Sequence, residues 1–322
     1  MPRLTDAIIE YLVPRETPPF NLVPHGVPDE VMRAGRERRG RDRLIFLWCT
    51  AFQAVIENNR WDKKFAGFQF ATYGFIPIIQ GLQVPDGIRF FESYVFGAAL
   101  QLEEAESSPT QEIFPIQEGN VSVPCVLNRG PIKTHQRHLL PFPSNPLGTG
   151  ACWARSRKQS ILPAADGVLT AAHIVSHIHR LKTPVLMSDG TYWHLGDRGN
   201  SKVDAALIVK SGCIPLTTKV LAVERIPIQG EDIEFYGITS GRIITAKVTR
   251  SHVHPTTLSD QFTMVVFFDD WGEEGDSGAL VLNIGSGAGV GIYSGVSVKS
   301  NEGYAQALCQ AQDVLEVELF ID

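Results

Sequence analysis

Hydrophobic and polar positions follow two different patterns along the chain, and the change falls near residue 148. Before it, an apolar run over 44–56 predicts a buried helix within a helical stretch at 30–59. Apolar side chains alternate over 68–72 as in a strand, while the pattern over 88–104 fits either a helix or a strand. Residues 1–30 are rich in proline, and we expect them to be extended or poorly ordered.

After residue 148, short β-prone runs alternate with turns rich in Gly, Asp and Asn, which predicts a sandwich or a barrel. The last stretch, 310–319, is expected to form a closing helix. The chain therefore divides into an N-terminal mixed α/β region, residues 1–120, and a mainly β domain, residues 121–322. The boundary lies within a proline-containing connection at 120–147. The predicted strands are 150–155, 167–171, 184–187, 203–209, 219–224, 232–236, 242–249, 262–268, 278–283, 288–292 and 304–309.

Composition adds mainly exclusions. The 322 residues carry a formal net charge of −6, which gives no reason to expect nucleic acid or an anionic membrane as a partner. Residues 1–20 lack the pattern of a signal peptide, and the run at 44–56 is too short to span a bilayer. Five scattered cysteines form neither a disulfide framework nor a CxxC pair. We therefore expect reduced thiols and a cytoplasmic location.

The first candidate for chemistry is the tetrapeptide Gly275-Asp276-Ser277-Gly278, which stands before a buried apolar run. A serine hydroxyl becomes a nucleophile only beside a base, and acyl transfer also needs N–H groups aimed at the developing oxyanion. A glycine-flanked serine in a tight turn can meet both needs. The natural oxyanion donors are the N–H groups of Gly275 and Ser277.

Two further pieces supply a base and a carboxylate. His173 follows a strand-like run and the small residues Ala171 and Ala172, and imidazole suits general base work near neutral pH. Asp204 heads another apolar strand, where a carboxylate needs a partner such as an imidazole N–H. His177 and His179 stand near His173, but no third ligand spacing supports a metal site.

Together, the segments LTAAH, DAALI and GDSGAL resemble the motifs of trypsin/chymotrypsin-like serine peptidases. The resemblance implies two antiparallel six-stranded β-barrels with an active site in the cleft between them. His173 and Asp204 would come from the first barrel and Ser277 from the second. The lack of paired cysteines makes the chain more similar to HtrA-type and viral chymotrypsin-like peptidases than to secreted digestive enzymes.

The same resemblance suggests where a substrate binds. The segment 291–295 resembles the strand that pairs with the substrate backbone, so Tyr293, Ser294 and Gly295 are expected to bind substrate. Trp271 and Gly272 resemble the base of the specificity pocket, which favours a small or apolar residue at the cleaved position. In secreted zymogens a freed N-terminal amine pairs with the aspartate that here is Asp276, and the sequence leaves its partner open.

The resemblance implies an intracellular endopeptidase that cleaves a protein or peptide substrate through an acyl-enzyme, without a metal or organic cofactor. Residues 1–120 would then regulate or recruit, and an activating partner protein is a further expectation. The alternative is a catalytically silent pseudo-peptidase that serves as a protein-binding scaffold.

Overall fold

The structure is a computed structural model of the chain. It describes residues 3–19, 24, 29–60, 64–65, 67–102, 110–129, 133–134, 148–158, 166–176, 178, 180–187, 191–200, 203–210, 219–224, 229–251, 254–255, 262–263, 265–297 and 300–321.

The chain begins with three helices. Helix α1, Asp6–Leu12, starts where the side chain of Thr5 accepts a hydrogen bond from the N–H of Ile8, at 3.3 Å. Its buried apolar residues show that the expectation of an extended or poorly ordered start is wrong for this segment. The single helical stretch expected over 30–59 is two helices, α2 at Asp29–Glu37 and α3 at Gly40–Asn58. Gly40 has a left-handed φ of 56°, which no continuous helix accommodates.

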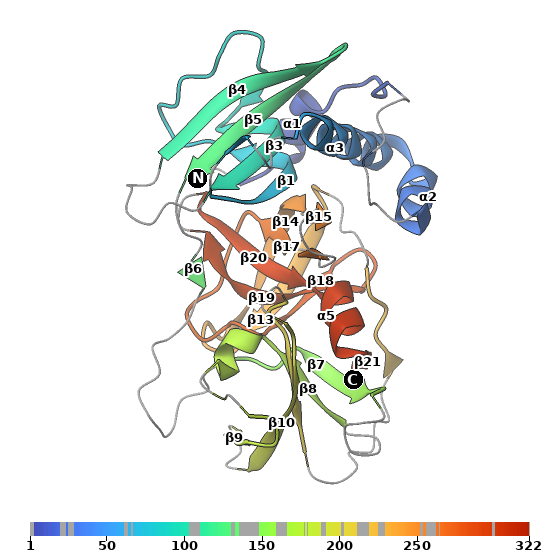
Figure 1. Ribbon diagram of the computed structural model, residues 1–322, viewed down its shortest axis with the longest axis vertical. Helices are drawn as coiled ribbons and strands as arrows, with labels where there is room; N and C mark the ends of the chain where they lie inside the picture. Colours follow the sequence, from blue (N-terminus) through green and yellow to red (C-terminus); the bar gives the residue numbers. More distant parts are fainter. Residues whose placement is uncertain are drawn as a thin grey trace.

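A sheet completes the N-terminal unit, and α1 and α3 pack on it (Figure 1). Its strands lie in the order β1-β3-β5-β4, with β2 beside β3. The alternative of a helix over 88–104 is therefore wrong. Strand β5 pairs with β3 and β4, so this sheet extends along the chain as far as Arg129. The bounds are β1 Phe68–Pro77, β2 Phe90–Phe91, β3 Tyr94–Leu102, β4 Thr110–Glu118 and β5 Val121–Arg129.

Six strands in the second half form a closed barrel. Their order is β13-β18-β19-β20-β17-β14, and a pairing between β13 and β14 closes the ring. The barrel interior holds a continuous apolar cluster that includes Phe235, Phe268 and Tyr293. The bounds are β13 Asp232–Gly237, β14 Arg242–Ser251, β17 Val265–Phe268, β18 Leu280–Asn283, β19 Gly289–Ser297 and β20 Glu302–Ala307. A small pair, β15 His254–Pro255 and β16 Phe262–Thr263, forms a separate two-stranded sheet.

Seven of the other described strands form a sheet in the order β12-β21-β7-β8-β11-β10-β9. The predicted mainly β, trypsin-like class is confirmed, with one closed six-stranded barrel and this second sheet. The chain's final stretch is only partly the expected helix, because α5, Leu308–Leu315, ends at a left-handed Glu316 and strand β21 follows. The bounds are β7 Cys152–Ser156, β8 Asp166–Thr170, β9 Pro184–Leu186, β10 Tyr192–Arg198, β11 Ala206–Val209, β12 Lys219–Val220 and β21 Val317–Ile321.

The N-terminal sheet and the closed barrel are one continuous sheet. Strand β1 pairs with β14 through Tyr73↔Ser251 and Gly74↔Arg250. A Cβ on Gly74 would lie 2.5 Å from the carbonyl oxygen of Thr249, so this close approach requires glycine. The N-terminal unit is therefore attached to the barrel by backbone pairing, and not only by a linker.

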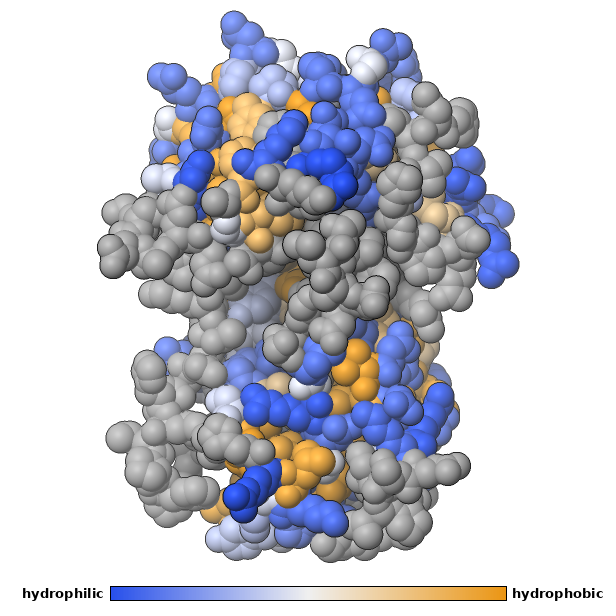
Figure 2. Space-filling model, viewed as in Figure 1, coloured by the Kyte–Doolittle hydropathy of each residue, from blue (hydrophilic) through white to orange (hydrophobic). Residues whose placement is uncertain are grey.

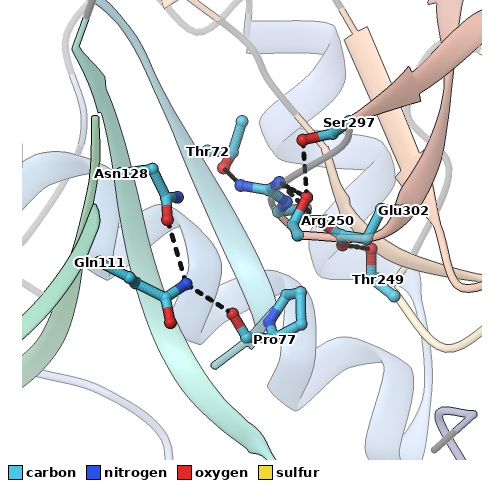
Figure 3. A network of polar contacts seen from close by, with 9 residues as sticks. Thr72, Pro77, Gln111, Asn128, Thr249, Arg250, Ser297 and Glu302 are labelled. Carbon is cyan, nitrogen blue, oxygen red and sulfur yellow. Dashed lines mark hydrogen bonds and ion pairs between the residues drawn. The ribbon is translucent and has the colours of Figure 1, made fainter. Parts of the chain in front are cut away.

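A buried ion pair lies at this junction (Figure 3). The guanidinium of Arg250 is 4% exposed and donates to Glu302 at 2.6 Å and to Thr72 of β1 at 2.8 Å. Thr249 donates to the second oxygen of Glu302, and the guanidinium also lies 4.0 Å from the ring centre of Phe267. Because both charges are removed from water, each depends on the other.

On the face seen in Figure 2, apolar residues appear in small groups among hydrophilic ones. Within the described ranges, every helix is too short or too polar to cross a membrane.

Candidate active site

The seven-stranded sheet brings His173 and Asp204 to the same end of two neighbouring strands. Strands β8 and β11 are antiparallel, with Thr170 opposite Ala206. His173 lies just after the end of β8, in a short 3₁₀ helix at Ala172–Val175. Asp204 lies just before the start of β11. In an antiparallel pair these two ends coincide, so the strand register alone places the two side chains together.

The carboxylate of Asp204 holds His173 with both of its oxygens. The distance from His173 Nδ1 to Asp204 Oδ2 is 2.7 Å, and the backbone N–H of His173 donates to Oδ1 at 2.9 Å. A carboxylate partner requires Nδ1 to carry a proton, which leaves Nε2 as the basic nitrogen when the ring is neutral. The side chain of His173 is 9% exposed, and its Nε2 atom has no hydrogen-bond partner among the described residues.

Asp204 is kept ionised by its neighbours. Burial acts to raise its pKa, but the His173 ring, the charge on that ring, the His173 N–H and the hydroxyl of Ser294 outweigh it, and the pKa falls below its ordinary value. The N–H of Asp204 donates to the side-chain oxygen of Gln306 on β20, at 3.1 Å. Sequence reasoning missed Gln306, whose only signal is a polar residue within a buried strand.

Ser277 lies in a turn that is fastened to β19. Its hydroxyl donates to the carbonyl of Ser294 at 3.1 Å, and the N–H of Gly278 donates to the carbonyl of Tyr293 at 2.7 Å. Its own carbonyl accepts the N–H of Thr149 at 2.7 Å. The hydroxyl is therefore turned toward β19, and no hydrogen bond joins it to Nε2 of His173 in this structure.

Residues adjoining Ser277 and His173 nevertheless meet. A Cβ on Gly278 would lie 3.0 Å from Cδ1 of Ile174, and Ile174 directly follows His173. Ser294 forms a second link, because its carbonyl accepts the hydroxyl of Ser277 and its own hydroxyl helps to lower the pKa of Asp204. The structure thus brings all three predicted residues into one neighbourhood, with the Asp–His pair formed and the serine hydroxyl on a different partner.

The partner of Asp276, which the sequence left open, is a set of backbone amides. Oδ1 accepts the N–H groups of Thr239 at 2.8 Å and Ser240 at 3.1 Å, and Oδ2 accepts the N–H of Glu273 at 2.9 Å. The residue is fully buried. The three backbone N–H groups satisfy the carboxylate without a chain-terminal amine. These hydrogen bonds fix the turn that leads to Ser277.

Glycines make room for this carboxylate and for the turn. A Cβ on Gly237 would overlap Oδ2 of Asp276, and one on Gly272 would lie 2.6 Å from it. Gly275 has a φ of 103°, which side chains rarely adopt, and a Cβ there would overlap Oγ1 of Thr239. The backbone that leads to the candidate oxyanion donors therefore depends on glycine at 275.

The predicted substrate-binding residues divide between the core and a strand edge. Tyr293 is fully buried, stacks on Phe235 at 4.6 Å between ring centres and accepts the N–H of Gly272 at 3.0 Å. Its ring therefore packs inside the barrel. Trp271 packs against the same core while partly exposed. Ser294 contacts Asp204 and Ser277, and Gly295 pairs with another segment of this chain.

The described residues offer neither a metal-binding group nor a reactive thiol among Cys49, Cys125 and Cys152. No group of three His, Cys, Asp or Glu side chains suited to a metal occurs within them. His177 and His179 lie outside the described residues. Burial raises the pKa of the thiols of Cys49, Cys125 and Cys152, the last to about 12, so these thiols stay protonated and unreactive near neutral pH.

Neither the family models nor the curated proteins contain a match. Solved structures similar to the chain are trypsin/chymotrypsin-like serine proteases. Thermobifida fusca Protease A has 14% identity over 56% of this chain and 95% of its own, with a TM-score of 0.40. A glutamic acid specific serine protease has 19% identity over 54% and 93%, with a TM-score of 0.39. The HtrA-type protease AlgW has 18% identity over 48% of each chain, with a TM-score of 0.37.

Proposed function

We propose that the protein is a serine endopeptidase in which Ser277 is the nucleophile, His173 the general base and Asp204 the residue that orients the base. One observation carries the proposal: a carboxylate-bound, buried imidazole keeps Nε2 without a partner beside the turn that holds Ser277. A buried nitrogen left unpaired is costly in a purely structural histidine, whereas a general base needs it open.

The reaction needs one movement before chemistry. Rotation about the Cα–Cβ bond of Ser277 would release its hydroxyl from the carbonyl of Ser294 and direct it to Nε2 of His173. Catalytic hydrogen bonds are often long or unformed before substrate binds, so the resting arrangement agrees with this step. The serine oxygen then attacks the substrate carbonyl as Nε2 takes the proton, and Asp204 stabilises the imidazolium that results.

The rest of the cycle follows from the same groups. The N–H groups of Gly275 and Ser277 would bind the oxyanion, and Nε2 would return its proton to the leaving amine. Water then hydrolyses the acyl-enzyme by the reverse proton route. No metal or organic cofactor takes part. Because backbone amides already hold Asp276, we propose that the turn is assembled without proteolytic activation, in a cytoplasmic protein whose substrate is a protein or peptide.

A fluorophosphonate probe tests this function, since it reacts with activated serines and needs little substrate recognition. We expect labelling of the wild type, none of Ser277→Ala, and a loss of at least about 100-fold in rate for His173→Ala. Ser122→Ala, at an exposed serine of β5, is the matched control and should label like the wild type. Folded wild-type protein that never labels would favour the pseudo-peptidase scaffold instead.

Cleavage profiling with a peptide library would then define the pocket. Trp271 and Gly272 are proposed to favour a small or apolar residue at the cleaved position. A clear preference for Lys or Arg there would contradict this assignment, while leaving the nucleophile and the base unaffected.

A further inference from the structure

One edge of strand β19 has three neighbours in succession along its length: strand β18, the hydroxyl of Ser277 and strand β6. Strand β18 covers its first part, with Leu280 opposite Ile292, and the bonds of Gly278 and Ala279 to Tyr293 end that pairing. At the next residue of β19, the hydroxyl of Ser277 donates a hydrogen bond to the carbonyl of Ser294. Beyond it, β18 no longer covers the edge, and the backbone of residues 295 and 296 is open to another strand.

A two-residue strand, β6 at Lys133–Thr134, takes this position. It pairs with β19 in antiparallel register, with Thr134 opposite Gly295 and Lys133 opposite Val296. In Figure 1, β6 lies beside the barrel, away from the sheet of the N-terminal unit that precedes it in sequence. Its pairing is therefore with the barrel, directly next to the point where Ser277 meets β19.

This strand follows the N-terminal unit closely in sequence. Strand β5 ends at Arg129, only a few residues before Lys133, and β5 belongs to the sheet that is joined to the barrel through β1 and β14. A strand tethered this closely competes at an effective concentration on the order of millimolar. Main-chain pairing to an open strand edge is also the way in which an extended peptide adds to a sheet.

We propose that β6 is an intramolecular occupant of the edge where β19 receives extended peptides, so that a polypeptide substrate must displace it. The inference rests on the proposed function, because it treats the edge beside Ser277 as the site of the substrate. It assigns the N-terminal unit a specific task, which is to deliver a competing strand to the barrel. The competition acts through backbone groups, so it depends on the amides of β6 and not on its side chains.

The test uses two double variants of the full chain. Lys133→Pro with Thr134→Pro removes both N–H groups and prevents pairing, while Lys133→Ala with Thr134→Ala keeps them and is the matched control. Hydrogen exchange followed by mass spectrometry should show faster exchange over 294–297 in the proline variant alone. Fluorescein-labelled casein serves as the extended substrate. If the edge is open in about a quarter of wild-type molecules, full opening lowers the apparent KM about fourfold.

Fluorophosphonate labelling separates the possible failures, since the probe is too small to need the strand edge. If the proline variant labels like the wild type but shows unchanged exchange and casein hydrolysis, the inference is overturned and the proposed function stands. If no variant labels, the proposed function fails, while the exchange data still decide whether β6 covers the edge. An equal gain in the alanine variant would also overturn the inference, because backbone pairing would not be the cause.

Discussion

Replacing Asp276 is the most informative perturbation of the site. Its buried carboxylate accepts three backbone N–H groups, and hydrogen bonds to charged groups contribute about 1.5–3 kcal/mol each. Asp276→Asn keeps an oxygen for Thr239 and Ser240 but sets an amide N–H₂ against the N–H of Glu273. We therefore expect a loss of about 2–4 kcal/mol in the free energy of unfolding. Asp276→Ala loses all three bonds, and a cost above about 4.5 kcal/mol would approach the whole stability of many domains.

Asp276→Asn is thus the variant to measure, by urea unfolding and by the rate of fluorophosphonate labelling. Loss of one oxyanion donor costs about 10²–10³ in rate, and a displaced turn moves the N–H groups of both Gly275 and Ser277. We expect folded Asp276→Asn protein to label at least about 100-fold more slowly. Asp232→Asn, at an exposed carboxylate paired with Lys247, is the control and should cost no more than about 1 kcal/mol. Equal stability and equal labelling of the two variants would refute the reasoning.

Three further predictions concern other parts of the fold. Arg250→Met should cost about 3–5 kcal/mol in urea unfolding because it leaves the buried Glu302 unpaired, and adding Glu302→Gln should recover most of it; a double variant as unstable as the single one would contradict this. Because the pKa of Asp204 is lower in the folded state, its carboxylate stabilises the fold at pH values above the unfolded-state pKa of about 3.9, and this contribution is lost as pH falls through the lower folded-state pKa. The urea midpoints of Asp204→Asn and the wild type should therefore converge below about pH 4. A constant difference between the two midpoints from about pH 7 to about pH 3 would count against this prediction. Gly237→Ala should lower stability by about 1–3 kcal/mol and slow labelling, because its methyl group overlaps the carboxylate held by the three amides. Gly285→Ala is the control: its methyl group would approach the side-chain oxygen of Asn283 at 3.3 Å, so it should cost less stability and label like the wild type.

The sequence predicted those parts of the protein that depend on short segments. His173 and Asp204 each stand at the end of an apolar run, so strand ends could be inferred, and the antiparallel register of β8 and β11 then does the rest. Most strands after residue 148 were predicted for the same reason. Helix α1 was missed because prolines further along the segment obscured the local signal of Thr5 and the apolar residues that follow it.

Contacts between distant segments could not be predicted in this way. The amides of Thr239 and Ser240 that hold Asp276 come from a hairpin turn far back in the sequence, and backbone N–H groups have no side-chain signature. The bond between Asp204 and Gln306 joins two different sheets. Strand β6 has only two residues in a proline-containing connection, too few for any periodicity, and it exists because β19 offers it a partner.

The backbone pairing between β1 and β14 has a consequence for any attempt to cut the protein in two. A truncated chain starting near residue 148 would keep the barrel but would expose the edge of β14 at Arg250 and Ser251, which β1 covers in the full chain. That edge would present unpaired amides and carbonyls, together with a guanidinium that had been shielded from water, to any neighbouring molecule. Exposed strand edges pair with other chains, so we expect such a fragment to self-associate. We therefore expect the first 129 residues to protect this edge of the barrel from association with other chains.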